Sequence, residues 1–355
     1  MKYIYSMKFL ITCSFILLGL TSLFSQYTDQ INSNRPGISI GAFAVGKNVV
    51  QLESGFAHQN YLHSGYNKST FNAGISFLSV RWGFLFERLE LTYQGAYLKG
   101  TLTSKLATEP TSTTKKGFTE NFLGLKFLLY DPYKKEEKIN VYSWKANNRF
   151  KLRDLLPAVS LTAGANAQLG KEQPYPYRNY FAQLYRPIFY QNIGVPLDQE
   201  PFLHFRATLA TQTHFLRTWV LVTNLSYQRI LSDYPEKNYI VTLTHTLNPL
   251  WSIYLENEGR YSDLFRNNLV RGGAAYLWSD DLQIEATVGA NTKNTPGMLF
   301  INAGVSYRLD FHKDFQTAAE LEAKSLNKQE KQVKKAIRKD SKTQKKRNKK
   351  AKRKN

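Results

Sequence analysis

The sequence almost lacks cysteine, and after residue 26 it has no apolar run long enough to form a membrane-spanning helix. The single cysteine, Cys13, lies inside an N-terminal apolar run over residues 9–23. If that run is removed, the mature chain has neither disulfide bonds nor thiol chemistry. Because a membrane helix needs about 20 apolar residues, the rest of the chain excludes a helical membrane bundle.

Motifs for metal binding and catalysis are also absent. The six histidines are scattered, without HxxxH or HExxH spacing. There is no GxSxG motif, which would mark a nucleophilic serine. We therefore expect no metal, no cofactor and no enzymatic activity.

The first 26 residues are typical of a cleaved export signal. Lys2 and Lys8 precede the apolar run, and the small residue Ser25 precedes Gln26. An uncleaved anchor helix is the alternative, although the run is short for a span of about 20 residues. We predict a signal peptide over residues 1–26, cleaved next to Ser25 or Gln26.

What the chain has instead is a high aromatic content of 14%, with 22 Tyr and 22 Phe, and strict alternation of apolar and polar residues. Side chains on a strand point alternately to its two faces, so alternation predicts one apolar and one polar face. The clearest stretch is as long as a tilted strand that crosses a bilayer, about 9–11 residues. Its apolar set is Leu299, Ile301, Ala303, Val305, Tyr307, Leu309 and Phe311.

The same pattern recurs along the chain and predicts twelve strands. They cover residues 48–59, 69–82, 88–98, 119–130, 156–169, 202–214, 219–231, 239–247, 251–260, 268–278, 282–291 and 298–311. Connections after even strands are mostly short, and the longest, 99–118 and 170–201, follow odd strands. This split is typical of an outer-membrane barrel with short periplasmic turns. The connection 131–155 is an exception, because it follows an even strand and is long. It either carries extra structure or contains a hairpin that the pattern does not reveal.

We therefore predict an all-β fold, a transmembrane antiparallel up-and-down β-barrel in the bacterial outer membrane. A large secreted β protein is the alternative. A periplasmic segment over 27–47 precedes the barrel at 48–311, and a basic tail over 312–355, disordered or helical, follows it. An even number of strands places both termini in the periplasm.

Charged residues within the strands fall on the polar face. A midplane Arg or Lys on the lipid face costs about 2–4 kcal/mol, so these side chains are expected to point into the lumen. They either brace the barrel as a network of opposite charges or form a lining that selects solutes. The expected lumen-lining residues are Glu53, Glu90, Arg206, Glu256, Glu258, Arg260, Arg271, Glu285 and Arg308.

Two segments outside the strands have unusual composition. Residues 171–200 are rich in proline and aromatics, and either pack over the lumen or contact a ligand or partner. The candidate contacts are Tyr175, Tyr177, Tyr180 and Tyr185. Residues 316–355 contain 16 Lys/Arg and 4 Asp/Glu, which accounts for most of the net charge of +21. Residues 324–354 would bind anionic lipid headgroups or an acidic periplasmic protein, or stay solvated; no nucleic acid is expected in that compartment.

Several stretches, in order, carry a family resemblance. Asn34-Arg-Pro-Gly37 precedes Gly46-Lys-Asn-Val-Val-Gln-Leu-Glu-Ser-Gly-Phe56, and Arg81 to Leu91 follows. Further points are Trp251 to Gly259, Tyr276 to Gly289 and Asn302-Ala-Gly-Val-Ser-Tyr-Arg-Leu309. Together they resemble the outer-membrane transporters grouped with the meta-pathway of phenol degradation. Asn34 stands where that family usually has Asp, and the aromatic loop and basic tail are not typical of it.

The resemblance implies a barrel embedded in outer-membrane lipid that passively transports a small, hydrophobic or aromatic solute. A second hypothesis is an envelope protein whose barrel is an anchor and whose tail or aromatic loop binds a partner. A lipid-modifying enzyme is the third. Barrel phospholipases place a serine and a histidine on the lipid-facing wall, and the sequence shows no matching arrangement.

Overall fold

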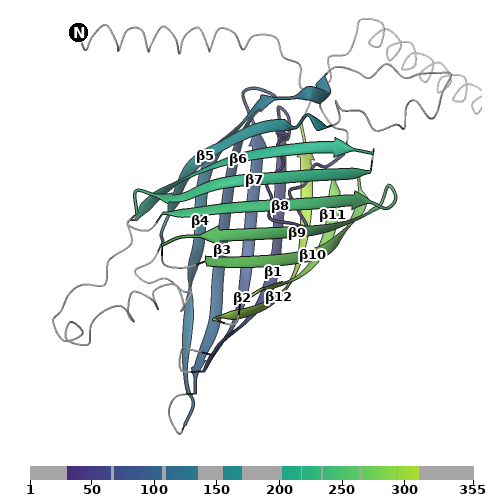
Figure 1. Ribbon diagram of the computed structural model, residues 1–355. Helices are drawn as coiled ribbons and strands as arrows, with labels where there is room; N and C mark the ends of the chain where they lie inside the picture. Colours follow the sequence, from purple (N-terminus) through teal and green to yellow (C-terminus); the bar gives the residue numbers. More distant parts are fainter. Residues whose placement is uncertain are drawn as a thin grey trace, which may run out of the picture. The chain divides into compact units, whose positions relative to one another are not determined.

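The computed structural model describes residues 30–64, 68–105, 109–134, 155–169, 202–216, 218–232, 235–263, 266–293 and 295–311. In these residues twelve antiparallel strands form one closed barrel, in which every strand pairs with its sequence neighbours and β1 pairs with β12 (Figure 1). No helix in these ranges is long and apolar enough to cross a membrane. The strands are β1 Val49–His63, β2 Ser69–Gly83, β3 Leu89–Ser104, β4 Thr111–Tyr130, β5 Ala158–Ala167, β6 Leu203–Phe215, β7 Trp219–Ile230, β8 Glu236–Thr246, β9 Trp251–Tyr261, β10 Arg266–Ser279, β11 Leu282–Asn291 and β12 Gly297–Asp310.

The predicted all-β barrel of twelve strands is confirmed, with one large difference in strand length. The connection expected over 99–118 is mostly strand, because β3 continues to Ser104 and β4 begins at Thr111. This hairpin extends beyond its neighbours at the lower end of Figure 1. Its threonines favour extended backbone, but both of its faces are polar. A test for alternating polarity therefore could not detect it.

The barrel is closed by the pairing of its first and last strands. β1 and β12 pair without interruption from Val49 opposite Asp310 to Leu62 opposite Gly297. Closure leaves no sheet edge with unpaired backbone groups along this seam, which is the condition for a sheet to stand in lipid.

The outer wall is apolar over a band of membrane width. Ile253, Leu255 and Val288 are examples of aliphatic side chains that are about half exposed on the outside. On β9 the outward positions run from Trp251, which contacts the ring of Tyr276, to Tyr261, which stacks on Tyr239. Asn257 is the polar exception between them, and it accepts a hydrogen bond from the hydroxyl of Tyr239 at 3.0 Å. Ten residues at about 3.4 Å, tilted by roughly 45°, span about 24 Å. Aromatic girdles separated by about 25 Å are the mark of a transmembrane barrel.

The interior, in contrast, is polar and charged. Arg81, Lys126, Glu90, Glu256 and Glu258 are among the largest fully buried side chains. Buried charges are tolerated only when paired and hydrogen-bonded. The inside of this barrel therefore depends on polar partners, which the following subsection describes. We call the end of the barrel with the connections after β2, β6, β8 and β10 the turn end, and the opposite end the loop end.

The apolar outer face yields a stability prediction. Val288 is 54% exposed in the middle of β11 and lies beside Ile301 of β12. Val288→Arg would place a charge in hydrocarbon, and we expect it to lower the free energy of unfolding in lipid by about 2–4 kcal/mol. Thr113→Arg, on the exposed hairpin beyond the girdle, is the control. Urea titration of the folded barrel in liposomes measures both, and equal stability of the two variants would contradict the lipid-facing assignment.

Candidate functional site: the barrel lumen

The N-terminal segment, residues 30–48, runs inside the barrel across the turn-end half of the lumen. It was expected as a periplasmic lead-in to the first strand, but its described part bonds to inward side chains of most strands. Its partners come from β1, β2, β3, β4, β6, β7, β9, β11 and β12. The segment therefore occupies the lumen from wall to wall.

One wall binds the segment as a neighbouring strand would. The side-chain amide of Asn224 on β7 accepts from the backbone N–H of Ile40 at 2.6 Å and donates to its carbonyl at 2.8 Å. Gln212 on β6 accepts from the backbone N–H of Ala42 at 3.0 Å. An extended segment cannot form hydrogen bonds between its own backbone groups. These side chains therefore supply the hydrogen bonds that a neighbouring strand would make.

The preceding part of the segment is bound by a carboxylate and two hydroxyls from β9 and β11. Glu256 on β9 accepts from the backbone N–H of Ile38 at 3.1 Å and of Ser39 at 3.3 Å. The preceding Gly37 passes so close to this carboxylate that a Cβ at Gly37 would collide with it. The hydroxyls of Tyr254 and Thr287 both donate to the carbonyl of Pro36, at 3.1 and 3.0 Å.

A cluster of buried charges holds the turn-end part of the segment. Arg81 binds both carboxylate oxygens of Glu90, at 2.7 and 2.9 Å, and Lys126 lies 3.4 Å from Glu90. The cluster also binds backbone: Lys126 donates to the carbonyl of Phe43 at 2.7 Å, and Glu90 accepts from the N–H of Val45 at 3.0 Å. Removing one partner of a buried ion pair typically costs about 3–5 kcal/mol. The same cluster therefore stabilises the barrel wall and holds the segment in place.

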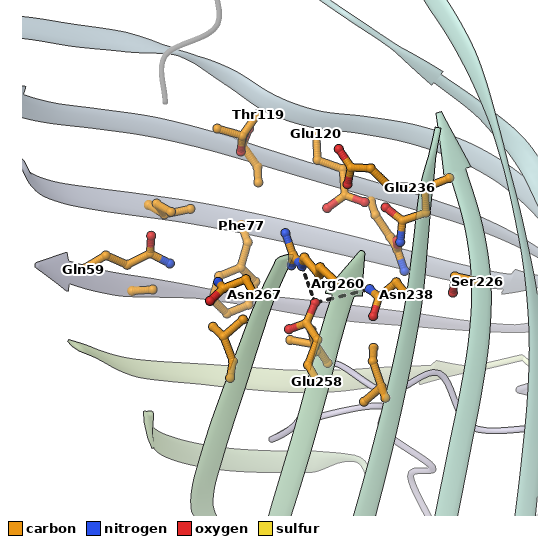
Figure 2. A pocket seen from close by; sticks show the side chains of 18 of the residues that line it. Gln59, Phe77, Thr119, Glu120, Ser226, Glu236, Asn238, Glu258, Arg260 and Asn267 are labelled. Carbon is orange, nitrogen blue, oxygen red and sulfur yellow. Dashed lines mark hydrogen bonds and ion pairs between the residues drawn. The ribbon is translucent and has the colours of Figure 1, made fainter. Parts of the chain in front are cut away.

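Above the segment, a cavity of about 920 Å³ reaches the loop end of the barrel. Its floor includes Asn34, Arg35 and Ile40 of the segment, and its walls come from inward side chains of the surrounding strands. Figure 2 shows polar side chains from several strands converging on this space, among them Gln59, Asn238 and Asn267. The volume is within the range of sites that bind small molecules, about 300–1,000 Å³.

Most charged side chains around the cavity are paired. Arg206 lies 2.6 Å from Glu120, and Arg229 lies 3.4 Å from Glu236. Arg260 donates to Glu258 at 2.5 Å (Figure 2). Arg271 bridges Glu258 and Glu256. The cavity therefore alternates positive and negative groups over short distances, and its field on a solute ion is weak.

Three phenylalanine rings of the lumen each contact a guanidinium group. Arg35 lies over Phe77 at 3.8 Å from the ring centroid, and Arg206 lies over Phe122 at 3.6 Å. Arg271 lies 5.7 Å from the centroid of Phe300. These distances are typical of cation–π contacts. One face of each ring is thus already in contact with a cation.

The nine charged residues expected in the lumen all belong to inward positions, but they divide into two groups. Glu53, Arg206, Glu258, Arg260 and Arg271 line the cavity. The other four lie outside that lining. Glu90 and Glu256 bind the segment, Glu285 lies 3.9 Å from Arg35, and Arg308 pairs with Asp281 at 2.8 Å.

Sequence reasoning missed the segment and several of its partners. Arg81 and Lys126 have the inward parity of their strands, which could have identified them. Gln212, Asn224 and Tyr254 carry no charge, and nothing in the sequence marks them as ligands of a peptide backbone.

Some of the expected sites lie outside the residues that the structure describes. These are the signal peptide, the tail with residues 324–354, and the aromatic loop with Tyr175, Tyr177, Tyr180 and Tyr185. Most of the connection 131–155 also lies outside; its described start holds a 3-10 helix, Pro132–Lys134. In the described ranges no group of three or more His, Cys, Asp or Glu residues is placed to hold a metal ion.

The placement of the segment can be tested by a disulfide bond. The hydroxyl oxygens of Ser33 in the segment and Ser306 on β12 are 2.8 Å apart, so the two side chains already meet. With Cys13→Ser as background, we expect Ser33→Cys/Ser306→Cys to cross-link under mild oxidation. The closed loop should make the denatured chain migrate faster on a non-reducing gel. Ser33→Cys alone is the control, and a pair that does not cross-link would contradict this position of the segment.

Comparison with known proteins identifies the family. The COG4313 outer membrane channel from Pseudomonas putida F1 is 13% identical with a TM-score of 0.43, over 79% of this chain and 100% of that chain. The transport unit of the autotransporter AIDA-I from Escherichia coli is 10% identical with a TM-score of 0.41, over 78% and 92%. No curated protein sequence matches the chain. The model of the family described as "Putative MetA-pathway of phenol degradation" matches residues 33–182 and 203–309, and the chain belongs to this family.

Proposed function

We propose that the protein is an outer-membrane channel through which small solutes pass passively, and that the N-terminal segment is its plug. The observation that carries the proposal is the cavity of about 920 Å³, lined by polar, charged and apolar side chains, inside a wall with an apolar outer band. A closed barrel with this outer face is stable in a bilayer, and its interior offers solutes a polar path. The expected export signal is consistent with this compartment.

The segment must move for a solute to pass from the cavity to the turn end. It forms the cavity floor and is bonded to strands around the barrel. Its bonds are mostly single hydrogen bonds between neutral or singly charged partners, each with a net contribution of about 0.5–3 kcal/mol. A local opening of the segment can therefore occur while the barrel stays folded.

The hydrophobic or aromatic solute that the family resemblance implies stays a prediction, and the lining favours it little. A phenyl group that buries about 120 Å² of apolar surface gains roughly 3 kcal/mol, at about 25 cal/mol per Å². Displacing water from a polar group without replacing its hydrogen bond costs about 1–3 kcal/mol. Two such groups on this lining offset the gain, so water-filled passage of polar solutes is favoured.

The second hypothesis, a barrel that anchors a partner-binding tail or aromatic loop, has no support from the described residues, because both segments lie outside them. Lipid and small solutes are the partners that the described barrel supports. No catalytic step is included in the proposal.

The disulfide-linked pair also tests the channel. In planar bilayers we expect Ser33→Cys/Ser306→Cys to conduct little when oxidised, because the plug is tied to β12, and to regain the conductance of the unmodified chain after reduction. Asn224→Ala removes both bonds to Ile40. We expect it to raise the open fraction at least threefold.

Two results would decide against the proposal in different ways. Equal conductance in the oxidised and reduced forms would show that solutes pass beside the segment, and the plug would be wrong. No conductance by the unmodified chain, by the reduced pair or by Asn224→Ala, with all three folded, would overturn the channel itself. Ser33→Cys alone, treated with the same oxidant, controls for oxidation of the barrel.

A further inference from the structure

We propose that the cavity above the plug is a binding site for uncharged, hydroxyl-rich solutes such as short saccharides. This inference rests on the proposed channel function and names the class of solute that its lumen selects. It differs from the hydrophobic or aromatic solute that the family resemblance implies. Three features of the lumen carry it: many carboxamides, charges that largely cancel, and aromatic rings that are partly covered by arginines.

Carboxamides are the dominant neutral polar groups of the lining. Eleven Asn and Gln residues contribute to it, and they come from β1, β3, β5, β7, β8, β10, β11, β12 and the plug. Asn34 and Asn224 already bond to the backbone of the plug. A carboxamide carries both donors and an acceptor, so those with remaining capacity can bind a hydroxyl group in either direction. In Figure 2 Gln59, Asn238 and Asn267 approach the same space from different strands. A solute with hydroxyls on all sides matches such a surface.

The charges in and around the cavity largely cancel: the lining holds seven Arg or Lys and five Asp or Glu, and Glu256 and Glu285 just outside it face Arg271 and Arg35. Arg206 and Arg229, which would attract an anion, are each within 3.4 Å of a carboxylate on a neighbouring part of the wall. An organic anion that approached Arg206 would also approach Glu120, and a cation at Glu258 would meet Arg260 and Arg271. Paired guanidinium and carboxylate groups still donate to and accept from hydroxyls, so they serve a neutral solute without opposing it.

Several aromatic rings of the lumen are partly covered, whereas Tyr61 and Phe118 line the cavity with no guanidinium of the described residues over them. Phe77, Phe122 and Phe300 each carry a guanidinium over one face. An aromatic solute would have to displace Arg35, Arg206 or Arg271 from its ring and from its ion pair before it could stack there. A hydroxylated solute can bind beside these arginines without moving them.

Three solutes of matched size and different charge test the selectivity. Glucose is neutral, gluconate carries one negative charge and glucosamine one positive charge. We expect labelled glucose to enter liposomes containing the full chain at least fivefold faster than either ion. Glu120→Gln leaves Arg206 without its carboxylate, and it should raise the ratio of gluconate to glucosamine uptake at least threefold. Glu109→Gln, an exposed position outside the cavity lining, is the matched control and should leave the ratio unchanged.

A binding measurement separates this inference from the channel proposal. Equilibrium dialysis of labelled maltotriose against the full chain in detergent measures binding to the cavity directly. Excess unlabelled maltotriose should displace the labelled maltotriose. Saturable binding in a barrel that does not conduct would support the site while overturning the channel. No saturable binding, or uptake of gluconate or glucosamine faster than glucose in a conducting barrel, would overturn the inference and leave the channel standing.

Discussion

The structure depends on the satisfaction of one extended stretch of backbone. Residues 30–48 cross a lumen in which they have no neighbouring strand, so their N–H and C=O groups need partners from the wall. The barrel supplies them with side chains: an amide at Asn224, a carboxylate at Glu256 and hydroxyls at Tyr254 and Thr287. The same carboxylates require cations because they are buried. Many of the inward side chains therefore either bind the backbone of this segment or pair with a charged group that does so.

The strands could be predicted because lipid imposes a strict rule on them. Along β9, β11 and β12, alternate side chains face the hydrocarbon and the side chains between them face the polar interior. Their periodicity is therefore visible in the sequence. The hairpin of β3 and β4 leaves the apolar band, where no such rule applies, and its length could not be predicted. Inward charges such as Arg206 and Glu258 followed from the same rule and from the cost of a charge in lipid.

The plug could not be predicted, because most of its hydrogen bonds to the wall are made by its backbone. Ile38, Ile40 and Ala42 are bound through their backbone, and no periodicity or charge pattern encodes that. Gly37 is the exception, since the wall leaves no room for a Cβ there. Likewise, the division of the inward charges between plug and cavity depends on the height of each residue in the barrel. Height follows from strand register, which the sequence alone does not give.

The position of the segment also constrains how the barrel can form. Residue 48 leads directly into β1, and β1 pairs with β12, so the seam joins the two ends of the barrel sequence. This is the pairing with the greatest separation along the chain and the largest loop to close. The segment must therefore be enclosed while the seam forms or enter afterwards through the turn end. In the first route the side chains of β6, β7 and β9 gather around the segment before closure, and the plug becomes a template for the curvature of the wall.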